Sequence, residues 1–247
     1  MLALAPVDAE RLSVRRGRFE EVGVLAAEEL PVPAIEEPLA PLAAELGRPR
    51  PEIDGQAMLA WARALRVSGR LAARVRAADD GLARLRAAIE DLGDLDWLAE
   101  RIETSLDERG EVRDDATPRL GKLRRRIAGR RQAAYSGLRG ILEAQGDLFS
   151  EDTVPLHNGR LVVMLRSSDR GRVDGLVHGR SSSGRSLYFE PLSVVDSNNA
   201  LQEAIGEEEA ERRRVLAELR EALQAEVEAL LAHLELVAMI DSLQAAW

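Results

Sequence analysis

The chain has 247 residues, of which 45% are hydrophobic and 3% aromatic, and its formal net charge at pH 7 is −9. A chain of this length forms one large domain or two small ones, and a core so poor in aromatic residues has to be built from Leu, Ala and Val, as in long helices. The acidic net charge argues against a uniformly basic nucleic-acid binder, and the lack of cysteine excludes disulfides and thiolate zinc sites. Because the sequence has no apolar run of membrane-spanning length and no signal peptide, we expect a soluble, cytoplasmic protein.

The first part of the chain, residues 1–115, reads as a helical core. Residues 1–50 are interrupted by prolines, so only short helices and turns fit there. Residues 55–109 carry apolar side chains at helical spacing, which predicts several helices of ordinary length broken near Gly69, Gly81 and Gly93.

A first long helix is predicted within residues 116–150. Asp115 or Thr117 can cap it and Pro118 suits its first turn. Its apolar positions run from Leu120 to Leu142, so it would extend from about Pro118 to Glu143 and measure about 40 Å.

The pattern changes to short β-type runs within residues 151–196. The runs TVPLHNGRLVVMLRSS, RGRVDGLVHGRS and RSLYFEPLSVV are separated by glycine turns, and Asn158-Gly159 is a hairpin signal, so we predict three or four antiparallel strands.

The run GRSSSGRS, from Gly179 to Ser186, is one residue away from a phosphate-binding P-loop, with Arg185 in place of lysine. A P-loop has to open a helix, whereas the following LYFEP is β-type, so we reject nucleotide binding here and interpret the run as a hairpin loop. An alternative stays open, in which its amides, hydroxyls and guanidinium groups contact a backbone phosphate.

From about Asn198 the helical pattern continues to Trp247, without Gly or Pro after Gly206. A single helix of that length, within residues 197–247, would measure about 75 Å. Since the β module interrupts two long helices, we expect them to run antiparallel with the module at their tip. The predicted fold is therefore mainly α, with a helical core, two long antiparallel helices and a small antiparallel β module inserted between them.

Two stretches carry a resemblance to a known family. They read ERGEVRDDATPRLGKLRRRI and NGRLVVMLRSSDRGRVDGLVHGRSSSGRSLYFEPLSVVDSNNALQEAIGEEEAERRRVL, and with their spacing they span about residues 105–220. They resemble the second bacterial branch of the MutS family (endonuclease MutS, type two), with Leu161 where the family has Tyr and Arg180 where it has Asp. The resemblance implies a core (1–115), a first lever helix (116–150), a β clamp (151–196) and a second lever helix (197–247).

The resemblance also implies a function. Family proteins carry an ATPase domain and an Smr nuclease domain, and this chain ends where the ATPase is expected to begin. We therefore expect no catalytic residues, no cofactor and no enzymatic activity in this fragment, with ATP and magnesium belonging to the missing ATPase domain. The three histidines, His157, His178 and His233, have no metal-ligand spacing.

The implied role is to grip branched or double-stranded DNA without reading sequence and so to restrain homologous recombination, as a homodimer in the full-length protein and with no membrane contact. Two alternatives stay open. In one, the fragment embraces collided ribosomes, and in the other it is a lever scaffold that transmits the ATPase state with no nucleic-acid contact of its own.

The candidate nucleic-acid-binding residues are basic side chains gathered in an acidic chain. Between Arg160 and Glu190 the clamp carries six arginines against three acidic residues, and the first lever carries eight basic residues and no acidic one between Ala116 and Leu142. The candidates are Arg160, Arg166, Arg170, Arg172, Arg180, Arg185, Lys122, Arg125 and Arg126. In the lever, such residues either track phosphates or pair with the second lever's Glu207, Glu208, Glu209 and Glu211.

Three neighbouring clamp residues complete the prediction. Tyr188 and Phe189 are adjacent in a strand, so one faces the clamp core and the other faces out, where its ring either packs or stacks on a base. Glu190 has no second catalytic group beside it in sequence, so we expect it to fix its loop through hydrogen bonds.

Overall fold

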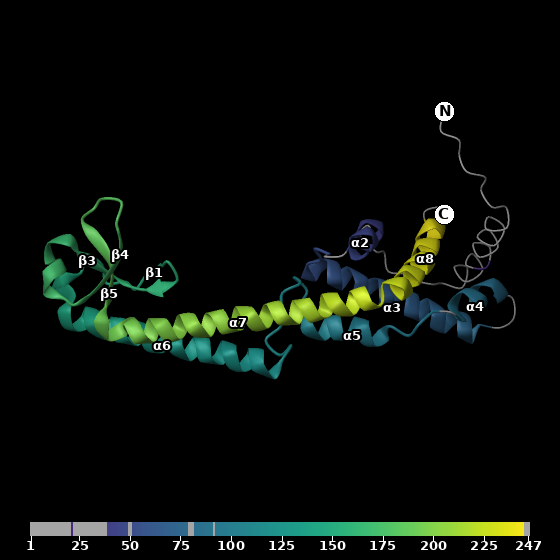
Figure 1. Ribbon diagram of the computed structural model, residues 1–247, viewed down its shortest axis with the longest axis horizontal. Coiled ribbons are helices and arrows are strands. Elements are labelled where there is room, and N and C mark those ends of the chain that lie inside the picture. Colours follow the sequence, from purple (N-terminus) through teal and green to yellow (C-terminus); the bar gives the residue numbers. More distant parts are fainter. Residues whose placement is uncertain (1–20, 22–38, 49–50, 79–81, 91, 245–247) are drawn as a thin grey trace, which may run out of the picture. The chain divides into compact units, whose positions relative to one another are not determined.

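The computed structural model describes residues 21, 39–48, 51–78, 82–90 and 92–244 (Figure 1). The chain forms two compact units, residues 1–113 with 215–247 and residues 114–214. The fold is mainly α with small antiparallel sheets, as predicted. Most of the proline-interrupted N-terminal segment, and the break expected at Gly81, lie outside the described residues.

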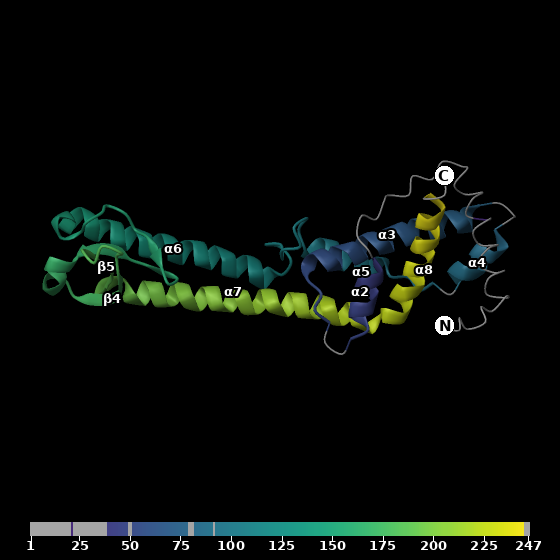
Figure 2. The same ribbon diagram turned by 90° about the horizontal axis from the view of Figure 1, so that it is seen from above.

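The first unit is helical. Its described helices are α2 (Leu39–Leu46), α3 (Gly55–Ala77), α4 (Ala83–Glu90), α5 (Asp96–Ser105), the end of α7 (Leu192–Ala225) and α8 (Val227–Gln244). The Asp54 carboxylate caps α3 by accepting a hydrogen bond from Ala57 N at 2.9 Å. Both α5 and α8 pack against α3 (Figure 2). Trp61 and Met58 of α3 are among the fully buried large side chains of the unit.

The break predicted at Gly69 was wrong, because α3 continues through it. Gly69 lies on an exposed face, and a glycine there costs a helix only about 1 kcal/mol. The neighbouring Leu65 and Leu71 are buried, and burial stabilises each by roughly 1.5–3 kcal/mol. Packing therefore outweighs the local preference. The break predicted at Gly93 is confirmed, since Gly93 lies between α4 and α5.

In the second unit, α6 (Pro118–Gln145) lies beside the first part of α7 (Figures 1 and 2). The helices run antiparallel, since Thr117 at the start of α6 bonds Glu211, whereas Gly137 near its other end lies beside Val194. Thr117 caps α6 by accepting from Leu120 N at 3.0 Å. The apolar positions predicted for this helix form its inner face, which confirms the helical pattern.

A small β module lies at one end of the α6–α7 pair (Figure 1). The sequence predicts three or four strands, and the structure has five short ones: β1 (Leu156–His157), β2 (Arg160–Leu161), β3 (Val163–Arg166), β4 (Gly175–Arg180) and β5 (Ser186–Pro191). All pairs are antiparallel, with β1 and β2 forming a hairpin and the other three ordered β3-β5-β4.

The hairpin turn is the one predicted. Asn158 and Gly159 have φ angles of 49° and 80°, the left-handed conformations that a two-residue hairpin turn requires. On the larger sheet, Leu165, Leu187 and Phe189 join the apolar core formed with α6 and α7.

Two predicted features of the second long helix were wrong. The residues LSVV, expected to continue a strand, begin α7, which starts at Leu192 rather than near Asn198. Val194 is buried in the core between α6 and the sheet, and Leu192 N donates to Asp174 O at 3.0 Å. Tertiary contacts therefore override the β preference of these residues.

The helix is also not continuous to the C-terminal end, because a turn at Glu226 separates α7 from α8. No Gly or Pro marks this turn. On α8, Leu236 and Val237 are buried in clusters with α3 residues such as Val75 and Ala64. The burial of this face accounts for the change of direction at the turn. None of the described helices has the length and apolar character of a membrane-spanning segment.

Candidate nucleic-acid interface

Four predicted arginines lie on exposed loops of the clamp. Arg170 and Arg172 belong to the 3-10 turn η2 (Ser167–Arg172), Arg180 ends β4 and Arg185 precedes β5. Arg172 bonds Asp169 at 3.1 Å, and the hydroxyl of Ser168 together with this guanidinium lowers the pKa of Asp169. Within the described part of the chain, the side chains of Arg170, Arg180 and Arg185 have no ion-pair or hydrogen-bond partner.

The Gly-Ser run between β4 and β5 is a hairpin loop, as interpreted from the sequence. Ser181 N donates to Ser186 O, and Gly184 N donates to Ser181 O, both at 2.9 Å. Gly184 has a φ of 69°, which favours glycine. Since a strand and not a helix follows, the loop lacks the helix N-terminus of a nucleotide phosphate site, and its residues do not fit ATP.

The other two clamp arginines are held by protein groups. Arg160 donates from Nη1 to Glu190 Oε1 at 2.7 Å and from Nη2 to Asn199 Oδ1 at 2.6 Å. Arg166 donates from Nε to Phe149 O at 3.1 Å. These contacts hold Arg160 by two nitrogens and the exposed Arg166 by its Nε alone, whereas Arg170, Arg180 and Arg185 remain available to an outside anion.

On α6 the basic residues divide into two groups. Arg119, Arg124 and Arg126 pair with α7 at Glu211 (3.7 Å), Glu208 (2.9 Å) and Glu207 (2.6 Å) respectively. This confirms the predicted attraction between the two helices for those residues. Four basic residues of α6 are exposed and have no acidic partner among the residues that the structure describes: the predicted Lys122 and Arg125, and also Arg130 and Arg131. These four keep the phosphate-tracking alternative open.

The paired residues have shifted pKa values. Burial lowers the pKa of Arg124, but the hydrogen bonds that it donates to Asp114 and Glu208 more than compensate and raise its pKa above the usual value. Glu211 is buried, and the Arg214 guanidinium, followed by the Thr117 hydroxyl, lowers its pKa. Both groups therefore keep their charge across the physiological range.

The two adjacent aromatic residues face opposite sides of the sheet, as predicted. Phe189 is in the apolar core. Tyr188 stacks on His157 of the β1–β2 hairpin, with ring centroids 3.9 Å apart and an interplanar angle of 5°. This contact favours packing over base stacking, because one face of the Tyr188 ring is already covered.

Glu190 is the centre of a polar cluster that sequence reasoning found only in part. Its carboxylate is fully buried and accepts hydrogen bonds from Arg160, His178 and Asn198. The prediction that Glu190 fixes the loop through hydrogen bonds is confirmed, but its partners were missed. They come from β2, β4 and α7, at positions 8 to 30 residues away in sequence, and the only local signal was the Asn198-Asn199 pair.

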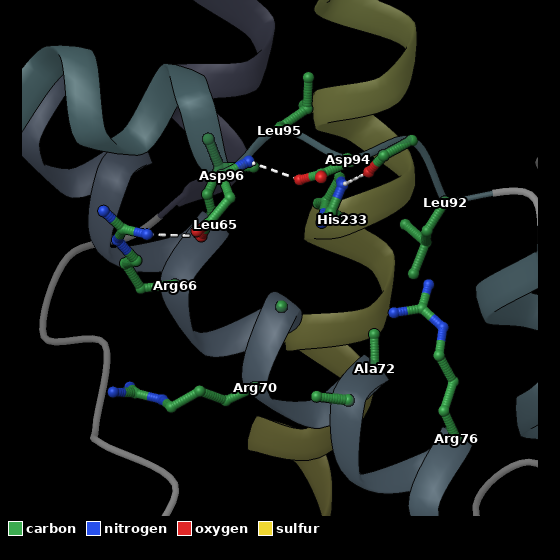
Figure 3. Close-up of a pocket in the computed structure, with 13 residues that line it drawn as sticks. Leu65, Arg66, Arg70, Ala72, Arg76, Leu92, Asp94, Leu95, Asp96 and His233 are labelled. Carbon is green, nitrogen blue, oxygen red and sulfur yellow. Dashed lines mark hydrogen bonds and ion pairs between the residues drawn. The ribbon is translucent and has the colours of Figure 1, made fainter.

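The first unit contains a hollow of about 600 Å³ beside α3 (Figure 3). Its floor is apolar, and several polar groups at its edge are already paired. Arg66 bonds Asp96 and Glu103, while His233 contacts Ser68 Oγ at 2.7 Å and Gly93 O at 2.9 Å. Figure 3 shows Arg70 and Arg76 extending apart, so they do not converge on one anion.

Metal binding has no support among the residues that the structure describes, where no group of three His, Cys, Asp or Glu side chains is placed to hold an ion.

No protein-family model matches the chain. Individual proteins do match. Endonuclease MutS2 from Thermus thermophilus is 32% identical over 92% of this chain and 34% of its own length, and Endonuclease MutS2 from Gemmatimonas aurantiaca is 34% identical over 98% and 30%. Endonuclease MutS2 from Symbiobacterium thermophilum is 36% identical over 66% of this chain and 21% of its own length. The chain thus spans about a fifth to a third of the length of these curated relatives.

Proposed function

This chain belongs to the MutS2 family, and from that premise we propose that it is a non-catalytic core, lever and clamp region that grips branched or double-stranded DNA without reading sequence. The observation that carries the proposal is the set of exposed, unpartnered cations on one unit of an acidic chain. Among the described residues these are Arg170, Arg180 and Arg185 on the clamp, and Lys122, Arg125, Arg130 and Arg131 on α6. In the full-length protein, such a grip would restrain homologous recombination.

Phosphate binding fits these side chains because guanidinium groups on loops neutralise backbone charge without contacting base edges. Each contact releases counterions, so the logarithm of the affinity falls with the logarithm of the salt concentration by about 0.9 per phosphate contacted. ATP and magnesium would act in other parts of the full-length protein. A homodimer would place two such regions around one nucleic acid.

The test is a variant in which Arg170, Arg172, Arg180 and Arg185 are all replaced by Ala. We expect weaker binding to a labelled DNA duplex and a salt slope lower by up to about 3.6, four contacts at about 0.9 each. The matched control replaces Arg70, Arg74, Arg76 and Arg109, four exposed arginines of the first unit. Equal binding by the two variants would exclude the clamp loops as the contact.

The same loops fit ribosomal RNA phosphates, since backbone contacts do not separate DNA from RNA. Binding to ribosomes with no binding to duplex or branched DNA would assign the grip to that partner. The ion pairs between α6 and α7 favour the second alternative, a lever scaffold, for Arg119, Arg124 and Arg126. Absence of binding to either polymer would leave the scaffold as the function.

A further inference from the structure

Glu190 joins four separate elements of the second unit. The residue lies on β5, and its three hydrogen-bond partners come from β2, β4 and α7. Arg160 Nη1 and Asn198 Nδ2 both donate to Oε1 at 2.7 Å, and His178 Nε2 contacts Oε2 at 2.6 Å. A carboxylate only accepts, so all three partners donate to it.

The first turns of α7 hold the β1–β2 hairpin through further polar side chains. Asn198 accepts from Leu161 N at 3.2 Å and donates to Leu161 O at 2.8 Å, as a neighbouring strand would. Gln202 donates to Gly159 O at 2.6 Å, and Asn199 accepts from Arg160. The hairpin is thus bound to α7 by polar side chains, of which Asn198 and Arg160 also bond Glu190.

We infer that Glu190 is a positioning residue, which holds β4, β5, the β1–β2 hairpin and the start of α7 together as one rigid body. The orientation of the clamp arginines is then fixed relative to α7. Arg180 lies two residues after His178 on β4, and Arg185 lies just before β5. If the cluster is broken, these loops are no longer fixed to the helix, and their contacts with a phosphate backbone no longer form together. This inference rests on the proposed grip of nucleic acid.

Glu190→Gln is the variant that tests it. Gln keeps the shape of the side chain but offers one oxygen and an NH₂ group, so one of the three hydrogen bonds is lost or, at His178, is kept only by a change of tautomer. The variant also removes the negative charge that pairs with Arg160. The matched control is Glu209→Gln, which removes the same charge from an exposed position on α7. Both full chains are compared by hydrogen exchange and by titration with a labelled DNA duplex at several salt concentrations.

We expect Glu190→Gln to lose exchange protection locally, at the Leu161 amide and its hairpin, while the apolar core of α6 and α7 stays protected. Binding should weaken by roughly 5- to 30-fold at physiological salt, the equivalent of one or two phosphate contacts. Unchanged protection and affinity, as for Glu209→Gln, would overturn the inference. So would a uniform loss of protection, which would indicate only a global loss of stability.

A second pair of variants serves if Glu190→Gln does not fold. His178 is partly exposed, and its replacement by Leu removes a single donor. His178→Gln restores a donor and should rescue both readouts, and failure of that rescue counts against the positioning role.

The variant lacking the four clamp arginines is measured in parallel. If it binds like the unmodified chain, the proposed interface is wrong, whatever Glu190 does. If it binds weakly while Glu190→Gln does not, the interface stands and the positioning role falls.

Discussion

The basic residues of α6 lead to a sharp prediction, because paired and unpaired cations alternate on one helix. Lys122 and Arg125 are exposed and lack an acidic partner in the described part of the chain, whereas Arg124 and Arg126 bond Glu208 and Glu207. Replacing either pair by Ala removes two positive charges from the same five-residue stretch, residues 122–126. The long-range electrostatic field of the protein therefore changes by the same amount in the two double variants, which differ only in the local contacts that they lose.

The magnitudes follow from these contacts. If Lys122 and Arg125 each neutralise one phosphate, their double variant should lower the salt slope by about 1.8 and the affinity at about 0.15 M salt by roughly 30-fold. The Arg124 and Arg126 double variant should leave the salt slope unchanged. It should instead cost about 1–2 kcal/mol of stability, since the pairs are partly exposed and screened by solvent.

Duplex binding across a salt series and urea unfolding measure the two quantities separately. Equal salt slopes for the two variants would refute the division of α6 into binding and pairing residues. An unchanged affinity for the Lys122 and Arg125 variant would remove these two residues from the interface, and the same test on Arg130 and Arg131, which are also exposed, would decide whether α6 takes part at all.

Three further predictions concern the fold. Gly69→Ala should raise the free energy of unfolding by about 1 kcal/mol, because the site is helical and a Cβ there meets nothing within 4 Å; destabilisation in urea unfolding would contradict this. Gly159→Ala should destabilise the β1–β2 hairpin by roughly 1–2 kcal/mol, because φ is 80° there and the new Cβ would lie 3.1 Å from Gln202 Oε1. The loss would be measured as faster hydrogen exchange of the hairpin amides. Burial lowers the pKa of His233 in the folded chain, so neutral His233 contributes to stability above about pH 6.5, and this contribution is lost as the pH falls through the lowered folded pKa. A His233→Gln variant should therefore show a smaller loss of stability on acidification, measured by denaturant titration at each pH.

Much of the second unit could be predicted because its signals are local. The cap at Thr117, the apolar positions of α6 and the Asn158-Gly159 turn each act within a few residues, and each is present in the structure. The acidic and basic halves of the two helices likewise predicted their pairing, and Glu207, Glu208 and Glu211 take part. Glu209 was expected to join them but is exposed.

The remaining features depend on contacts between residues distant in sequence. Burial against other elements decides three of them: the continuation of α3 through Gly69, the start of α7 at Leu192 and the turn at Glu226. In each case the free energy of burial outweighs local propensities of about 1 kcal/mol. The same reason separates the clamp arginines. Composition placed all six clamp arginines in one group. Only the tertiary structure brings Glu190 beside Arg160 and leaves Arg170, Arg180 and Arg185 facing solvent. The physical reason is that a buried carboxylate has to be paired, whereas exposed cations do not.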